Sequence, residues 1–329
     1  MKAPFTEEIF RVTDAQSFEK MALEIFRFQA AGCPVYKEYL GLLGVEPGRI
    51  DNLFSVPFMP VSFFRDHDIM TGGGDPQRIF LSSGTAGVRQ SRHMVKNMTL
   101  YDESLERAFR IFYGEPSSFA VMGLLPSYLE REGSSLIYMV NRLMSLSGNL
   151  HGGFFLNDHE ALLSSIAEAR KAGLGILLIG VTFALLDLAE SHPADLSDVI
   201  IMETGGMKGR RREMIREEVH EIIMKAFGVT SVHSEYGMTE LLSQAYSRGE
   251  GLFMAPPWMK VLIRDSHDPA AHTDEPGATG GISVIDLANI YSCSFIATAD
   301  LGRLHPGGLF EVQGRFDEAD IRGCNLLVN

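Results

Sequence analysis

Apolar and polar positions at the start of the chain follow the period of a helix. Over residues 15–31 the apolar side chains recur at intervals that would line one face of an amphipathic helix. Pro34 follows closely and is expected to help end this helix. Residues 51–70 are rich in turn-forming residues, with prolines among aromatic side chains. The pattern predicts a helix and then an irregular segment.

In the middle of the chain, short apolar runs alternate with segments of helical period. The predicted strands are 79–81, 119–125, 174–179, 199–202 and 229–232, and the predicted helices are 99–113, 134–146, 158–172 and 210–227. Strands that alternate with helices are typical of a parallel sheet covered by helices. We therefore expect an α/β fold with mostly parallel sheets flanked by helices.

After residue 252 the helical period disappears. Short β-rich runs at 260–264, 281–286 and 292–298 are separated by Pro/Gly turns, which predicts a β-rich C-terminal subdomain. We expect residues 1–329 to form a single domain, with an α/β core over 1–251 and the β-rich subdomain and C-terminal tail over 252–329. A chain of this length can bury a sizeable core.

The formal net charge of −13 predicts an acidic surface. General nucleic-acid binders and proteins that bind anionic membranes need a basic footprint, so the charge argues against both classes. A local basic pocket for an anionic ligand remains compatible with this net charge.

No targeting or membrane-spanning segment is expected. The start, MKAPFTEEIF, lacks the basic and apolar regions of a signal peptide. The longest apolar run, Leu174 to Leu186, is shorter than the ~20 residues of a membrane span and contains Gly180. The cysteines Cys33, Cys293 and Cys324 are widely separated and odd in number, which argues against a disulfide framework. We expect a cytoplasmic protein.

A loop of small and hydroxylated residues follows the first predicted strand: Ser82-Ser83-Gly84-Thr85-Ala86-Gly87. Small residues let the backbone approach a phosphate, and successive N–H groups can form an anion-binding nest. Arg89, Arg92 and His93 follow and could neutralise phosphate charge. The loop is not a Walker A motif, which requires GxxxxGK[ST]. A tight turn with no ligand is the alternative.

A second candidate segment is Ser234-Glu235-Tyr236-Gly237-Met238-Thr239-Glu240. It offers an aromatic face for a base, a hydroxyl, and a carboxylate of the kind that binds Mg²⁺ through oxygen. A third, Thr298-Ala299-Asp300-Leu301-Gly302-Arg303, precedes Gly314-Arg315-Phe316-Asp317. A carboxylate at a strand end can accept two ribose hydroxyls, and an arginine nearby can meet phosphate or sugar oxygens. Structural turns are the alternative for each segment alone.

The order of these motifs resembles the adenylate-forming (ANL) superfamily of acyl-CoA synthetases and adenylation domains. A hydroxyl-rich loop, a Tyr-Gly-x-Thr-Glu, a Thr-x-Asp-x-Gly and a Gly-Arg-x-Asp follow one another over roughly residues 80–325. The wording SEYGMTELLSQAYS and the short length are most similar to the LuxE family, the acyl-protein synthetases of bacterial bioluminescence. The fold implied is that of the adenylate-forming N-terminal domain.

The resemblance implies a role for each matching residue. Ser82, Ser83, Gly84, Thr85 and Gly87 would hold the β- and γ-phosphates of ATP, and Thr204-Gly205-Gly206 would form the glycine-rich wall of the adenine pocket. The residues implied for the nucleotide and its metal are Tyr236 (adenine stacking) with Gly237, Thr239 (α-phosphate region), Glu240 (Mg²⁺), Asp300 (ribose hydroxyls) and Arg315 (ribose or phosphate).

The chain departs from the superfamily pattern in two places. The lysine that usually ends the phosphate loop is replaced near Gln90, with Arg89 and Arg92 beside it. The C-terminal domain that carries the catalytic lysine of acyl-CoA synthetases has no counterpart, since the sequence given ends at Asn329. A conventional acid–CoA ligase is therefore not the expected activity.

Cys324 is the candidate nucleophile, because acyl-protein synthetases carry their acyl-accepting cysteine near the C-terminus. The neighbouring Arg322 would favour the thiolate, which is the reactive form. An inert cysteine in a final strand is the alternative. Cys293, among aromatic residues, and Cys33, at a helix end, are expected in the core.

The resemblance therefore implies an ATP- and Mg²⁺-dependent ligase that activates a carboxylic acid, expected to be a fatty acid, as an acyl-adenylate and transfers the acyl group to a cysteine thiol. An acyl-CoA reductase is the protein partner that this family implies. Two alternatives stay open. One is a truncated activator, similar to phenylacetate–CoA ligase, that delivers acyl-AMP to CoA or a carrier protein. The other is a non-catalytic nucleotide- or acyl-binding scaffold subunit.

Overall fold

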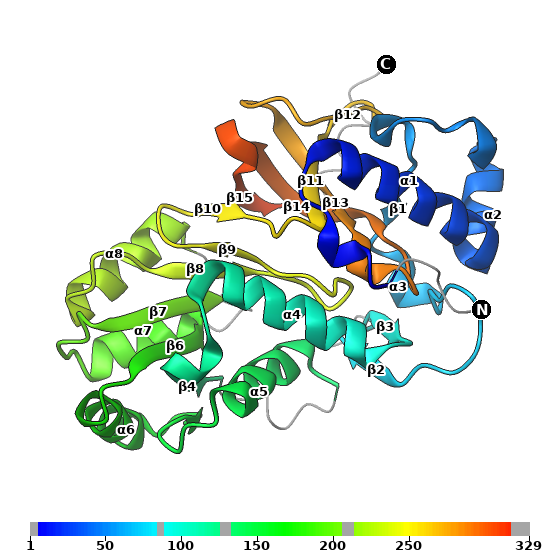
Figure 1. The fold of residues 1–329 in the computed structure, drawn as a ribbon. Helices are drawn as coiled ribbons and strands as arrows, with labels where there is room; N and C mark the ends of the chain where they lie inside the picture. The colour runs from blue at the N-terminus through cyan, green and yellow to red at the C-terminus, as the bar shows by residue number, and fades with distance from the viewer. Residues whose placement is uncertain (1–5, 84–88, 126–132, 206–213, 317–329) are drawn as a thin grey trace.

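One mixed sheet runs through the protein and is flanked by helices (Figure 1). The computed structural model describes residues 6–83, 89–125, 133–205 and 214–316. The helices are α1 (Ala15–Gly32), α2 (Pro34–Leu42), α3 (Phe63–Asp66), α4 (Met98–Tyr113), α5 (Ser135–Ser147), α6 (His159–Lys171), α7 (Thr182–Ser191) and α8 (Arg216–Phe227).

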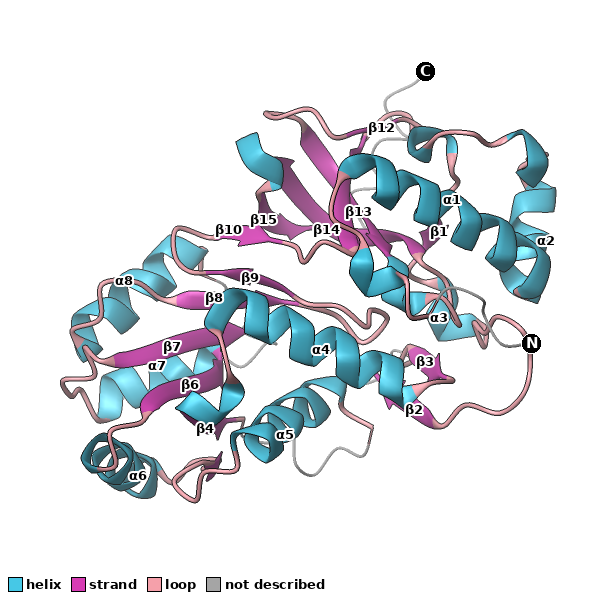
Figure 2. Cartoon of the chain, viewed as in Figure 1, coloured by secondary structure: helices cyan, strands magenta, loops and turns pink. Residues whose placement is uncertain are grey.

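The first half of the sheet is parallel, as the sequence predicts. Its strands are β4 (Phe119–Leu124), β5 (Gly153–Phe154), β6 (Gly175–Val181), β7 (Val199–Thr204) and β8 (His233–Tyr236), in the spatial order β8-β7-β6-β4-β5. Helices α4 and α5 lie on the viewer's side of these strands, and α7 and α8 lie behind them (Figure 2). Covering on both faces explains why β6 is a nearly continuous apolar run.

The second half is antiparallel and confirms the β-rich subdomain. Short strands β9 (Ala245–Ser247) and β10 (Leu252–Met254) connect the halves. Beyond them lie β15 (Phe310–Arg315), β14 (Phe295–Leu304), β13 (Thr279–Asp286), β11 (Met259–Arg264) and β12 (His272–Thr273). β1 (Met59–Pro60) pairs with β14 in parallel, while β2 (Arg78–Leu81) and β3 (Arg92–Val95) form a separate hairpin.

The N-terminal helix packs beside the last strands of the chain. The ring of Phe26 in α1 meets that of Phe295 in β14 edge-on, with centroids 5.9 Å apart. The buried Gln29 amide donates to the carbonyls of Asn289 (3.1 Å) and Ile290 (3.0 Å), and its oxygen accepts from the backbone of Ser294 (3.0 Å). The division expected at residue 251 stays a prediction.

One sequence prediction of local structure was wrong, and two helices, α2 and α7, were not predicted. The first helix ends at Gly32, shortly before Pro34 as expected, and Pro34 is also the first residue of α2, where a missing N–H costs nothing. The strand expected at 229–232 begins instead at His233, so it consists of polar residues whose side chains are paired. α7 was not predicted because it is buried almost all round and has no polar face.

Part of the expected helix 210–227 falls outside the described residues; the described part starts at Arg216. Among the described helices, none is both long and apolar enough to cross a bilayer.

Candidate nucleotide site

The carboxyl end of β8 carries Tyr236, and its side chain points toward the antiparallel half of the sheet. Its ring meets Phe253 and Phe310 edge-on, with centroids 5.9 and 5.4 Å away. The hydroxyl donates to Asp300 Oδ2 at 2.9 Å. Burial, together with the Asp300 charge, raises the pKa of Tyr236 well above its usual range, so the hydroxyl keeps its proton and remains a donor. The expected stacking on adenine stays a prediction.

Asp300 and Arg315 face each other on neighbouring strands. They are register partners in the β14–β15 pair, and Arg315 Nε donates to Asp300 Oδ1 at 3.1 Å. An ionised carboxylate has about four acceptor positions. Tyr236 and Arg315 occupy one on each oxygen, so two remain for a pair of hydroxyls. The Arg315 side chain is 70% exposed and can also reach a ligand.

Glu240 lies close to this group but is only 5% exposed. Burial raises the pKa of its carboxyl, while a hydrogen bond with Ser91 and the charge of Arg315 oppose that rise. Ser91 directly precedes β3, so Glu240 connects the Tyr-Gly-x-Thr-Glu segment with the end of the hydroxyl-rich loop.

Residues far apart in sequence hold the Thr239–Glu240 segment in place. The His93 ring lies 2.8 Å from the Thr239 carbonyl oxygen and 3.0 Å from Asn289 Oδ1. Asn289 Nδ2 donates to the Glu240 carbonyl at 2.8 Å, and Asp286 accepts from the backbone of Leu242 at 2.8 Å. These buried polar groups fix the loop, because leaving any of them unpaired would cost about 1–3 kcal/mol.

His93, Asn289 and Asp286 are therefore positioning residues. His93 was expected beside phosphate, but it is 1% exposed and supports the loop instead. The basic residues expected next to it have acidic partners: Arg92 pairs with Asp68 at 2.6 Å and Arg89 approaches Asp66 at 3.8 Å. Sequence reasoning missed the roles of Asp286, the last residue of β13, and of Asn289 shortly after it, because neither belongs to one of the candidate motifs.

The base of the hydroxyl-rich loop is closed by its own first residue. Ser82 Oγ accepts from the Ser91 backbone at 2.9 Å, and Gln90 Nε2 donates to the Ser82 carbonyl at 2.8 Å. Ser83 is exposed beside it. The other expected site residues Gly84, Thr85, Gly87, Gly206 and Cys324 lie outside the described residues.

Gly205 directly follows β7 and has a φ of +71°, a conformation that favours glycine. Thr182 Oγ1 bonds both the Gly205 carbonyl and Glu203 Oε2, each at 2.9 Å. Glu203 Oε1 accepts from Ser234 Oγ at 2.9 Å, which ties β7 to β8. The ends of β7 and β8, which the resemblance assigns to the adenine pocket, thus lie side by side.

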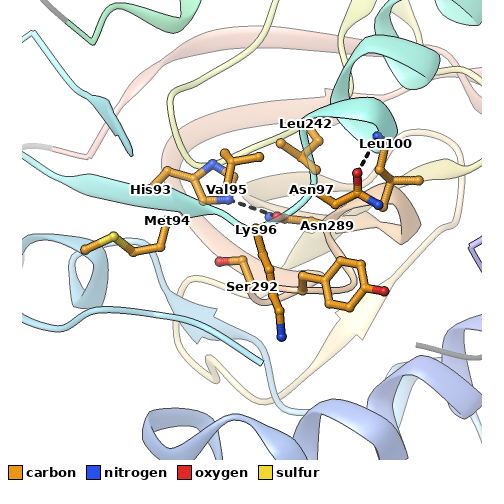
Figure 3. A pocket seen from close by; sticks show the side chains of 10 residues that line it. His93, Met94, Val95, Lys96, Asn97, Leu100, Leu242, Asn289 and Ser292 are labelled. Carbon is orange, nitrogen blue, oxygen red and sulfur yellow. Dashed lines mark hydrogen bonds between the residues drawn. The ribbon is translucent and has the colours of Figure 1, made fainter. Parts of the chain in front are cut away.

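A pocket beside the loop is too small to be the ligand site. It is lined by His93, Lys96, Leu242 and Asn289, among others (Figure 3). It has room for at most one water. Lys96 does not reach into open space, because its ammonium donates to the Gly72 carbonyl at 3.1 Å.

Within the described ranges, no cluster of three or more His, Cys, Asp or Glu side chains could hold a metal by itself. Mg²⁺ bound with a nucleotide commonly uses one or two carboxylates, substrate phosphates and waters. Glu240 is the carboxylate that the resemblance assigns to Mg²⁺, and this assignment stays a prediction.

Glu235 points away from Tyr236, toward the other face of the sheet. Thr204 Oγ1 donates to its Oε2 at 2.6 Å. Removal from water raises the pKa of Glu235 to about 7; the Thr204 hydrogen bond opposes the rise and the Glu203 charge adds to it.

Glu235→Gln is expected to change how stability depends on pH. Because the folded pKa lies above the ordinary 4.5, the unfolded chain ionises first as pH rises. The wild type should therefore lose stability relative to Glu235→Gln between about pH 4.5 and pH 7. We expect a loss of a few kcal/mol, since one pKa unit corresponds to about 1.4 kcal/mol. Urea denaturation of both proteins across that range measures it, and parallel curves would contradict the shift.

Solved structures of other proteins share the fold, whereas no family model and no curated protein sequence matches the chain. An open conformation of 2-hydroxyisobutyryl-CoA ligase in complex with 2-HIB-AMP and CoA superimposes with a TM-score of 0.67 at 12% identity, over 93% of this chain and 77% of that one. ATP-bound MatB from Rhodopseudomonas palustris superimposes with a TM-score of 0.55 at 17% identity, over 74% and 49%.

A long-chain-fatty-acid–CoA ligase from Archaeoglobus fulgidus gives a TM-score of 0.52 at 14% identity, over 76% of this chain and 53% of that one. The chain thus spans about half the length of this ligase and of MatB. These neighbours are adenylate-forming enzymes, and the likeness establishes the α/β fold of their N-terminal domain.

Proposed function

We propose that the protein activates a carboxylic acid with ATP, as an acyl-adenylate, and transfers the acyl group to a protein cysteine in the manner of the acyl-protein synthetases. The observation that carries this proposal is that Asp300 of β14 is hydrogen-bonded to both Tyr236 of β8 and Arg315 of β15. Glu240 lies close enough to Asp300 and Arg315 for their charges to affect the pKa of its carboxyl. The shared fold is the second support.

In the proposed first step, a carboxylate oxygen of the acid attacks the α-phosphorus of ATP. A new P–O bond forms, the bond to the β-phosphate oxygen breaks, and pyrophosphate leaves. Catalysis of this kind depends on positioning and on charge stabilisation. Asp300 would orient the ribose, Arg315 and Thr239 would meet the phosphate region, and Glu240 would hold Mg²⁺, which supplies neutralising charge to the phosphates when bound.

In the proposed second step, a cysteine thiolate attacks the acyl carbon, the bond to AMP breaks, and the thiol proton passes to solvent. Cys324 is assigned this role from the sequence. The other two cysteines are poorly suited, because both are fully buried. Burial raises the pKa of the Cys33 and Cys293 thiols, so neither supplies thiolate readily.

A second candidate is delivery of acyl-AMP to CoA or a carrier protein. It is favoured by the neighbour that covers 93% of this chain, a ligase solved with 2-HIB-AMP and CoA. Adding CoA to the reaction separates the two: a CoA thioester in solution supports this candidate, and an acyl mass on the protein supports transfer to cysteine. Nucleotide binding without pyrophosphate release would leave the scaffold alternative.

ATP with Mg²⁺ is expected to raise the melting temperature, because a ligand that binds only the folded state stabilises it. Asp300→Ala and Tyr236→Ala should remove most of that rise, since the first removes the ribose acceptor and the second its hydrogen-bonded neighbour. Asp75→Asn, an exposed acidic position, is the control and should keep the full shift. An unchanged melting temperature with ATP, AMP and an acyl-sulfamoyl-adenosine would refute nucleotide binding.

A further inference from the structure

Polar side chains gather on the face of the sheet opposite Tyr236. Residues opposite each other in neighbouring strands project to the same face. Glu235 is the register partner of Thr204 in β7 and of Tyr246 in β9, so all three share one face. Gln244 joins them, since a Cβ added at Gly237 would lie 2.3 Å from Glu235 Oε1 and 3.4 Å from Gln244 Cγ. Helix α4 covers this face, where Phe112 packs on Tyr246.

Two atoms of this cluster are buried without a partner. Tyr246 is 2% exposed and Gln244 is 4% exposed. Among the residues that the structure describes, the Tyr246 hydroxyl and Gln244 Oε1 have no hydrogen bond. Glu235 is close enough for its charge to raise the pKa of Tyr246. Groups of this kind cost free energy unless a ligand or a water pairs them, so each calls for an explanation.

The cluster lies next to the nucleotide residues, because Glu235 directly precedes Tyr236 in β8. The nucleotide residues Tyr236 and Asp300 occupy one face of the strand end, and the Tyr-Gly-x-Thr-Glu loop separates them from Glu235 on the other. If the adenylate bridges this strand end, the acyl part points toward Thr204, Glu235 and Tyr246. Gln244 Oε1 and the Tyr246 hydroxyl oxygen, which have no partner among the described residues, can accept hydrogen bonds, and an aliphatic chain alone would leave them unpaired.

We propose, resting on the proposed function, that the acid carries a hydrogen-bond donor, an amino or a hydroxyl group, which Glu235, Gln244 and Tyr246 bind. Gly237 permits this arrangement, because any larger residue there would displace the Glu235 carboxylate. Such a site discriminates strongly between acids, because an analogue without the polar group leaves the buried polar groups of the site without hydrogen-bond partners. The acid is thus a substituted one and not a plain fatty acid.

The test compares pyrophosphate release for matched acids. Unsubstituted alkanoic acids from short to long chains are measured beside their amino and hydroxy counterparts, substituted at the second carbon and at the far end. The wild type is expected to show kcat/KM at least tenfold higher for a substituted acid than for its parent. Glu235→Leu should abolish this preference, and Glu235→Gln should weaken it more for amino than for hydroxy acids. The comparison of amino acids with hydroxy acids identifies which hydrogen-bond donor of the substrate the site binds.

Tyr246→Phe keeps the packing on Phe112 and is expected to reduce the preference while the protein stays folded. Tyr113→Phe is the control: its hydroxyl meets His233 at 3.1 Å at the start of β8, and its loss should leave the preference intact. Equal turnover of parent and substituted acids, or an unchanged preference in Glu235→Leu, overturns the inference and leaves the proposed function standing. If none of the acids supports pyrophosphate release, although ATP raises the melting temperature, the proposed function is overturned instead.

Discussion

Cys324→Ser is expected to abolish acyl labelling of the protein while acyl-AMP formation persists. With ATP, Mg²⁺ and a competent acid, the wild type should gain one acyl mass that hydroxylamine removes, as a thioester requires. The serine hydroxyl is far less nucleophilic than a thiolate at neutral pH, so the second half-reaction should stop. Intact-protein mass spectrometry, with pyrophosphate release measured in parallel, separates the two steps.

The other cysteines supply the control for this experiment. Cys33→Ala and Cys293→Ala should still become labelled, because both thiols are buried in the native protein. A label that persists in Cys324→Ser would move the acceptor elsewhere. A product found only on added CoA would favour the truncated-ligase alternative.

Glu240→Gln is expected to lower acid-dependent pyrophosphate release at least tenfold, which is roughly 1.4 kcal/mol of transition-state stabilisation. The amide keeps the shape of the side chain but loses the charge that would hold Mg²⁺. Steady-state release at saturating ATP measures the effect, and raising Mg²⁺ should restore part of it if metal binding is the cause.

Glu38→Gln is the matched control, since Glu38 is an exposed glutamate on α2. It should leave turnover unchanged. If Glu240→Gln also turns over at the wild-type rate, Glu240 has no part in the reaction, and its burial has only a structural meaning.

The sequence predicted the parallel half of the sheet well, because strands buried on both faces leave apolar runs that are easy to read. It failed at β8 for a physical reason. Ser234 and Glu235 are polar, yet they fit inside the sheet because Glu203 and Thr204 on the neighbouring strand pair them. Such pairing is a tertiary property, and no local pattern shows it. α7 was missed because a helix buried all round lacks the period of an amphipathic one.

For the candidate site, the ordered motifs placed Tyr236, Asp300 and Arg315 in one constellation, and the structure brings these three together. The supporting residues could not be predicted in the same way. His93, Asp286 and Asn289 act through hydrogen bonds to backbone atoms of residues 239–243, and contacts to backbone impose no motif on the sequence. The roles in binding and catalysis remain predictions.

The contact of Gln29 with residues 289–294 also constrains how the chain can be made. Its amide partners lie 260 or more positions later in the sequence. When α1 leaves the ribosome, most of the strands that will cover its apolar face have not been synthesised, and contacts over such long separations form slowly. Folding cannot proceed strictly from the N-terminus. The apolar face of the first helix therefore stays uncovered by its partners until β14 has been synthesised, which is for most of translation.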